Sequence, residues 1–130
     1  MKKILLVFAA FLLLLSGCTK KAEPLSFDGT VTAINISSLP EGINYSISDA
    51  ESIDKLINYF TSLHLESKYS ENPDTLGGMT WVIEISYADG RSETINHFGN
   101  MFLKKDAGPW YKMDVEEASQ LAPLLEDLMK

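Results

Sequence analysis

Residues 80–98 of this 130-residue chain, TWVIEISYADGRSETINHF, decide its fold. In residues 80–87 apolar side chains alternate with polar ones, which is typical of a strand with one buried face. Residues 88–90, Ala-Asp-Gly, favour a turn, and residues 92–98 follow as a second strand. This segment therefore predicts an antiparallel hairpin.

The length of the hairpin loop decides which side chains share a face, because a shift of one residue exchanges the two faces of a strand. A two-residue loop would leave Ile95 facing a glutamate. A three-residue loop, with Gly90 in the left-handed conformation, sets Ile83 opposite Ile95. The same register places Trp81 opposite His97. We expect the three-residue loop, because it keeps the apolar side chains on one face.

Upstream of the hairpin, the sequence predicts two strands and a helix. Residues 30–36 are rich in β-branched side chains, and residues 43–47 form a shorter candidate strand. Ser48 and Glu51 have the spacing of a capping box, which predicts a helix over residues 49–63. Its apolar side chains recur at helical spacing and predict one buried face: Ile53, Leu56, Ile57, Phe60 and Leu63.

Downstream of the hairpin, residues 99–105 and 110–113 predict a further pair of strands. Asp114 and Glu117 give a second capping signal, and apolar residues at helical spacing follow it. Pro123 falls inside this pattern, where it would remove a hydrogen bond and clash with the preceding turn. Either the helix kinks there, or a second short helix begins with Pro123 in its first turn.

Together these elements predict an α+β fold: an antiparallel sheet of about four to five strands with two helices, one after the N-terminal strands and one at the C-terminus. Residues 66–78 are polar and contain Asn-Pro-Asp and Gly-Gly. They predict a loop well beyond the usual length of about 4–6 residues. A loop of this length is either functional or only mobile.

Composition limits the functions open to the chain. It carries 18 acidic and 11 basic side chains, for a formal net charge of −7, and a single cysteine. An acidic chain is not expected to bind nucleic acid. One cysteine forms neither an internal disulfide nor a multi-cysteine metal site. The length allows one domain with a modest core.

The N-terminus has the features of an export signal. Lys2 and Lys3 precede an uninterrupted apolar run over residues 4–15. A helix of that length rises about 18 Å, well short of the roughly 30 Å hydrocarbon core of a bilayer. The segment therefore predicts a signal peptide and not a permanent membrane span.

The four residues that end this segment, Leu15-Ser16-Gly17-Cys18, resemble the lipobox of bacterial lipoprotein precursors. The resemblance implies that a signal peptidase recognises Leu15, Ser16 and Gly17. It also implies that Cys18 becomes the lipidated N-terminus. The alternatives are an ordinary cleaved signal with a chance cysteine, and an uncleaved anchor.

A lipoprotein of this kind has three parts. Residues 1–17 are the signal peptide, residues 18–27 are the lipidated tether, and residues 28–130 form a single α+β domain. The tether spans at most about 25–30 Å when extended. We expect the protein in the bacterial cell envelope, outside the cytoplasm, held at the membrane by acyl chains such as palmitate on Cys18.

Few residues suggest chemistry. We expect His64 to lie at the surface where the first helix ends, and His97 to be a partly buried cross-strand partner. Neither histidine belongs to a catalytic triad or a metal-binding motif, and no glycine-rich phosphate loop occurs. We therefore expect no catalytic residue, cofactor or metal, and predict a non-catalytic binding or accessory module that contacts another envelope protein. The alternative is a small extracytoplasmic hydrolase that uses His97 with a nearby carboxylate.

Aromatic side chains gather in and around the predicted sheet, and they allow two interpretations. They form the core of a small domain, or they present a contact surface for a peptide or protein. For the second interpretation, the candidate contact residues are Trp110, Tyr111, His97 and Phe98.

The mature domain resembles small uncharacterised lipoproteins of Gram-positive bacteria. The similar elements are the helix at residues 52–57, the hairpin at 83–90, and His-Phe-Gly-Asn at 97–100 followed by Trp-Tyr at 110–111. The resemblance covers most of residues 45–127. It implies a small α+β fold at the envelope and carries no activity or functional residues with it.

Overall fold

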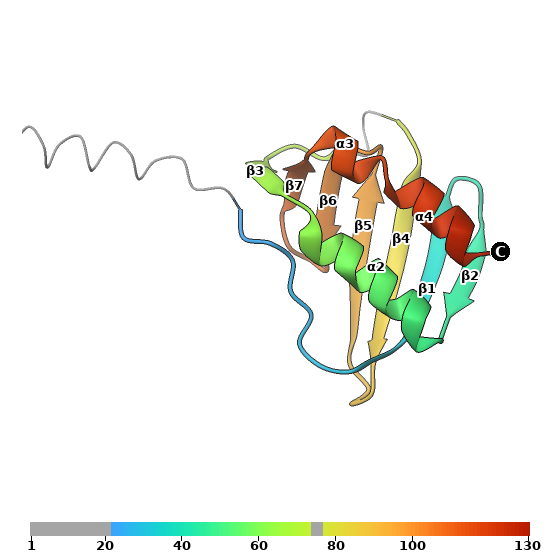
Figure 1. The fold of residues 1–130 in the computed structure, drawn as a ribbon. Coiled ribbons are helices and arrows are strands. Elements are labelled where there is room, and N and C mark those ends of the chain that lie inside the picture. Colours follow the sequence, from blue (N-terminus) through green and yellow to red (C-terminus); the bar gives the residue numbers. More distant parts are fainter. Residues whose placement is uncertain (1–21, 74–76) are drawn as a thin grey trace, which may run out of the picture.

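A seven-stranded antiparallel sheet forms one layer of the protein, and its helices lie together on one face of that sheet (Figure 1). The computed structural model describes residues 22–73 and 77–130. The strand order is β2-β1-β4-β5-β6-β7-β3. The strands are β1 (Val31–Leu39), β2 (Asn44–Ile47), β3 (Leu65–Tyr69), β4 (Thr80–Tyr87), β5 (Ser92–Phe98), β6 (Phe102–Lys105) and β7 (Trp110–Met113). The helices are α2 (Ala50–Ser62), α3 (Val115–Ala118) and α4 (Leu121–Leu128).

The predicted α+β class with an antiparallel sheet is confirmed, but the predicted number of strands is too low. The main omission is β3, which begins at Leu65 and takes up the start of the predicted loop at residues 66–78. β3 pairs with β7 and forms one edge of the sheet. Its sequence, LESKY, contains no β-branched residue, so it carries no strand signal of its own.

The predicted hairpin register is confirmed. Ile83 lies opposite Ile95 and Trp81 lies opposite His97, while the turn glycine, Gly90, has a φ of 90°. The apolar residues of the hairpin therefore point to a single face.

Helix α2 begins one residue later than its predicted capping box. Asp49, and not Ser48, is the N-cap, and its carboxylate accepts a hydrogen bond from the backbone N–H of Ser52 at 2.9 Å. Ile53, Leu56 and Phe60 are buried as predicted, and Ile57 packs partly buried at the side of the core. The buried residues of α2 also include Tyr59.

The C-terminal pattern forms two short helices. Asp114 caps α3 by accepting a hydrogen bond from the backbone N–H of Glu117 at 3.1 Å, as the spacing of these residues predicts. Pro123 is the third residue of α4 and so lies in its first turn. Of the two alternatives for Pro123, the structure adopts the second short helix, because a first-turn N–H has no intrahelical partner to lose.

The two faces of the sheet have different characters. The face under the helices holds the core, where Ile34, Ile36, Ile83, Ile85 and Ile95 are at most 1% exposed. The opposite face, called here the helix-free face, carries the alternate residues of the same strands. This follows from the twofold period of a strand.

Residues 22–28, called here the strap, run from the β3 edge across the molecule toward β1 (Figure 1). Phe27 lies 6.5 Å from the ring of Phe60, and Leu25 also packs against the core. Lys105 Nζ donates a hydrogen bond to the carbonyl of Ser26 at 2.9 Å. Most of the strap falls within the predicted tether, so much of that segment packs on the domain.

Candidate functional site

His97 is an internal group. It is fully buried on β5, and its Nε2 donates a hydrogen bond of 3.1 Å to the hydroxyl of Tyr59. That hydroxyl in turn donates to the carbonyl of Ala118 at 3.2 Å. This arrangement places the ring proton on Nε2 and leaves Nδ1 without a partner. Burial lowers the pKa of His97 to about 4, so the ring is neutral at pH 7.

His64 is exposed and belongs to a different contact. Its backbone N–H donates to one carboxylate oxygen of Glu117 at 2.8 Å, and its Nδ1 lies 2.5 Å from the other. These hydrogen bonds lower the pKa of Glu117. The pair ties the segment after α2 to α3, and in the described residues no further side chain hydrogen-bonds the imidazole.

The structure does not bring the four candidate contact residues together. His97 and Phe98 are both buried, and they point to opposite faces of β5. Trp110 and Tyr111 are half-buried and also face opposite ways, because adjacent residues of a strand alternate. The predicted surface is therefore not continuous, and only Trp110 keeps an accessible ring on the helix-free face.

Trp110 belongs to an aromatic cluster on the helix-free face, formed by Tyr69, Phe98, Phe102 and Trp110. The ring centroids of Tyr69 and Phe102 are 4.4 Å apart, and Phe98 lies 6.5 Å from both Phe102 and Trp110. Lys104 Nζ lies over the ring of Trp110 at 5.7 Å. Phe98 and Phe102 are buried within the cluster, whereas Tyr69 and Trp110 are half-buried.

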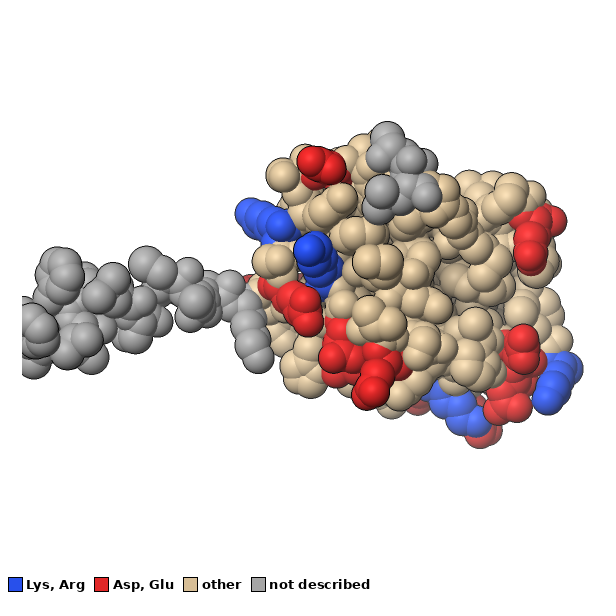
Figure 2. Space-filling view, turned by 90° about the horizontal axis from the view of Figure 1, so that it is seen from above, with Lys and Arg blue, Asp and Glu red and all other residues tan. Residues whose placement is uncertain are grey.

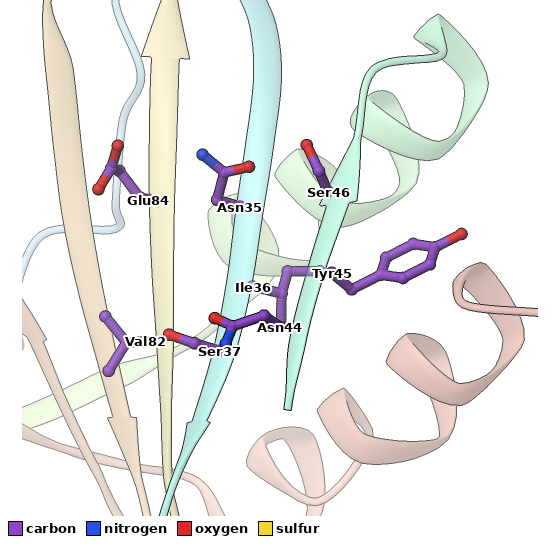
Figure 3. A pocket seen from close by; sticks show the side chains of 8 residues that line it. All are labelled: Asn35, Ile36, Ser37, Asn44, Tyr45, Ser46, Val82 and Glu84. Atoms are coloured by element: carbon purple, nitrogen blue, oxygen red, sulfur yellow. The ribbon is translucent and has the colours of Figure 1, made fainter. Parts of the chain in front are cut away.

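A polar groove of about 430 Å³ lies on the other half of this face, across β2, β1 and β4 (Figure 3). The register arranges its outward side chains in two rows. One row contains Asn44, Ser37 and Val82, and the other contains Ser46, Asn35 and Glu84. Tyr45 also lines the groove, but its ring points away from the two rows, toward the helices (Figure 3).

Most polar side chains of this groove are uncommitted, although Asn44 Nδ2 donates a hydrogen bond to the carbonyl of Gly42 at 3.4 Å. In the described part of the chain, the side chains of Asn35, Ser37, Ser46 and Glu84 make no hydrogen bond or ion pair. They therefore offer amide, hydroxyl and carboxylate groups to a ligand at little cost in broken internal bonds. Sequence reasoning missed them, although the alternation in β1 between buried isoleucines and polar residues was the available signal.

A second groove, of about 400 Å³, lies beside the strap on the opposite face of the sheet. Tyr111 lines it together with Leu65, Leu103 and Lys105. The strap contributes residues 23–26 to its wall. Tyr111 therefore faces a partly apolar recess that the chain's own N-terminal segment borders.

The arrangement offers contacts and no assembled reaction centre in the described residues. Neither histidine lines the two grooves just described. Among residues 22–73 and 77–130, no three histidine, cysteine, aspartate or glutamate side chains gather as metal ligands would. In the same residues, no helix is long and apolar enough to cross a membrane.

The chain matches none of the protein-family models, curated proteins or solved structures with which it was compared.

Proposed function

We propose that the chain is a lipid-anchored, non-catalytic binding module that contacts another protein of the bacterial cell envelope through its helix-free face. The anchor is supported by the apolar run that ends in Leu15-Ser16-Gly17-Cys18. These residues lie outside the described part of the structure. The contact is supported by the helix-free face itself.

One observation carries the proposed contact: the helix-free face combines a half-exposed tryptophan with a groove of uncommitted polar groups. Trp110 is held in place by Phe98, and a rigid aromatic ring is a common anchor of protein interfaces. Asn35 and Glu84, on the other half of the same face, can supply polar contacts at the rim of such an interface. The neighbouring strands fix both parts, so little order has to be gained on binding.

The positions of the histidines favour binding over hydrolysis. The alternative function would use His97 with a nearby carboxylate, but His97 is fully buried and hydrogen-bonds Tyr59. Its lowered pKa also makes it a weak base at neutral pH. His64 does meet a carboxylate, yet both oxygens of Glu117 are engaged by His64 itself.

Cross-linking in intact cells tests this proposal. A photoreactive residue at Ser37, in the groove, should form a cross-link to a membrane or envelope protein. Trp110→Ala should reduce that cross-link severalfold, because it removes the anchor of the contact. Tyr111→Ala is the matched control, since this half-buried ring is next to Trp110 on β7 but lies on the opposite face of the sheet. No cross-link from Ser37, or an equal loss in both variants, would refute the proposed contact.

A further inference from the structure

The anchor and the strap together determine how the domain meets the membrane. The described chain begins at Ala22, and the N–H of Ala22 donates a hydrogen bond to the carbonyl of Glu66 on β3 at 3.1 Å. The strap that follows is fixed to the domain along its length by Phe27 and Ser26. Arg91 also donates to the carbonyl of Asp28 at 2.6 Å.

Docking of the strap shortens the free tether. Only residues 19–21 separate Cys18 from Ala22. At about 3.3–3.6 Å per residue, these four steps span at most about 14 Å. That is roughly half the reach expected when the whole tether is free. A lipidated Cys18 therefore cannot lie far from β3.

We propose that the β3 edge, residues 65–69 with the adjoining end of β7, is the membrane-facing surface of the protein and rests on lipid headgroups. This inference depends on the lipid anchor of the proposed function. The opposite edge, β2, is six strand spacings away, or about 29 Å at roughly 4.8 Å per spacing. The sheet therefore stands on its β3 edge with β2 farthest from the bilayer.

The side chains at this edge are compatible with headgroups. Lys68 and Lys112 are exposed, and Lys112 Nζ lies 5.8 Å from the ring centre of Tyr69. Lysine together with half-buried aromatic rings is typical of membrane–water interfaces. Figure 2 shows basic side chains at the β3 end of the molecule with acidic ones nearby. Glu66 lies at the same edge, so the short tether, more than net charge, determines the orientation.

This orientation has a consequence for the groove. The groove spans β2, β1 and β4, so it lies in the half of the sheet farther from β3. It would be presented above the headgroups and not pressed against them. The helix-free face would stand upright, accessible to a partner that projects from the membrane.

Fluorescence quenching tests the orientation. Ser67→Cys on β3 and Ser46→Cys on β2 are a matched pair, because both serines are exposed and lie on opposite edge strands. Each full-length protein is labelled at the new thiol and reconstituted in phosphatidylethanolamine–phosphatidylglycerol vesicles that contain a headgroup-linked quencher. We expect severalfold stronger quenching at residue 67 than at residue 46.

A tether variant provides the control. A flexible Gly-Ser insert between Lys21 and Ala22 lengthens the free segment, so the difference in quenching should shrink. Equal quenching at the two edges in the wild-type background would overturn the orientation. An unchanged difference after the insertion would overturn the tether as its cause. Mass spectrometry of the same preparations reports lipid at Cys18, so failure of the anchor itself is distinguishable and removes the basis for the inference.

Discussion

A histidine inside a small apolar core is tolerated at position 97 because it is neutral there. Its Nε2 is satisfied by Tyr59, but Nδ1 has no partner, and an unsatisfied buried acceptor has a cost of about 1–3 kcal/mol. Protonation of His97 would cost more free energy, since it would place a positive charge in the core without a carboxylate partner. The same residue links β5 to α2, and through Ala118 to α3.

The burial of His97 predicts a loss of stability in mild acid. Its folded pKa, about 4, lies below the ordinary value of 6.5, so the unfolded chain takes up the proton first as pH falls. The neutral His97 therefore contributes fully to the free energy of unfolding above pH 6.5. This contribution is lost progressively as the pH falls from 6.5 to 4. Between pH 7 and about pH 5 the free energy of unfolding should fall by about 2 kcal/mol from this group alone.

Urea melts at the two pH values measure this effect when the wild type is compared with His97→Leu. The leucine variant should lose that part of the pH dependence, and Tyr59 can still donate its proton to Ala118. Other titrating groups are common to both proteins and cancel in the comparison. Equal losses in the two proteins would show that His97 does not titrate as a buried base.

The pair Trp110 and Tyr111 shows where residue-level prediction fails. Both rings are accessible in part, as a contact surface requires, but the alternation of a strand sends them to opposite faces. That alternation could be foreseen once residues 110–113 are assigned to a strand. Which of the two faces lacks helices could not, because it depends on how distant segments pack.

Among the elements, α2 provides most of the helix contact with the sheet. Phe60 is fully buried and packs beside Tyr59, with ring centroids 5.1 Å apart. Phe60→Ala should lower the free energy of unfolding by about 3–5 kcal/mol, because it removes apolar area and leaves a cavity. Denaturant melts provide the measurement, and Asn58→Ala, an exposed residue of the same helix, provides the control. A loss below about 1 kcal/mol would contradict burial of this face.

The tie between α3 and the end of α2 is weaker. Glu117 accepts two hydrogen bonds from His64, but its side chain is 31% exposed, so water competes with them. Glu117→Gln should therefore reduce stability by no more than about 1 kcal/mol at pH 7. Because the folded pKa of Glu117 is lowered, this contribution is present above its ordinary pKa and disappears as pH falls through the lowered value. Denaturant melts of the wild type and of Glu117→Gln should give free energies of unfolding that become equal in acid. A difference that stays constant with pH would contradict this contribution of Glu117.

The elements that sequence reasoning found are those with internal patterns. The β4–β5 hairpin carries its alternation and its turn, and α2 carries its apolar period, so both could be predicted locally. β3 has neither. Its backbone is extended because it pairs with β7, more than forty positions farther along the chain. Such a distant pairing produces no pattern within residues 65–69 that would predict a strand. The groove across β2, β1 and β4 depends in part on a similarly distant pairing, that of β1 with β4.

At the scale of the whole molecule, the strap and the sheet divide the surface into parts with different roles. The helices close one face over the core, and the other face stays available for contact. The strap begins at the β3 edge, where Ala22 is hydrogen-bonded to Glu66. The C-terminus lies at the opposite end of the sheet, beside β2 (Figure 1). A chain held by its N-terminus at this edge would therefore present its remaining surface away from the anchor.

The proposed lipid anchor at Cys18 determines how the whole protein is processed and whether it is held at the membrane. Cys18 is the only cysteine, and it follows the small residues Ser16 and Gly17 at the end of the apolar run. We expect mass spectrometry of the mature N-terminus to show cleavage before Cys18. We also expect more than one acyl chain on Cys18, since one chain alone gives only marginal membrane binding. Cys18→Ser should leave unprocessed or released protein, whereas Thr19→Ser, the adjacent control, should be processed normally. An unmodified Cys18, or cleavage at another site, would show that the chain is exported by a different route and that its domain is not held at the membrane by lipid.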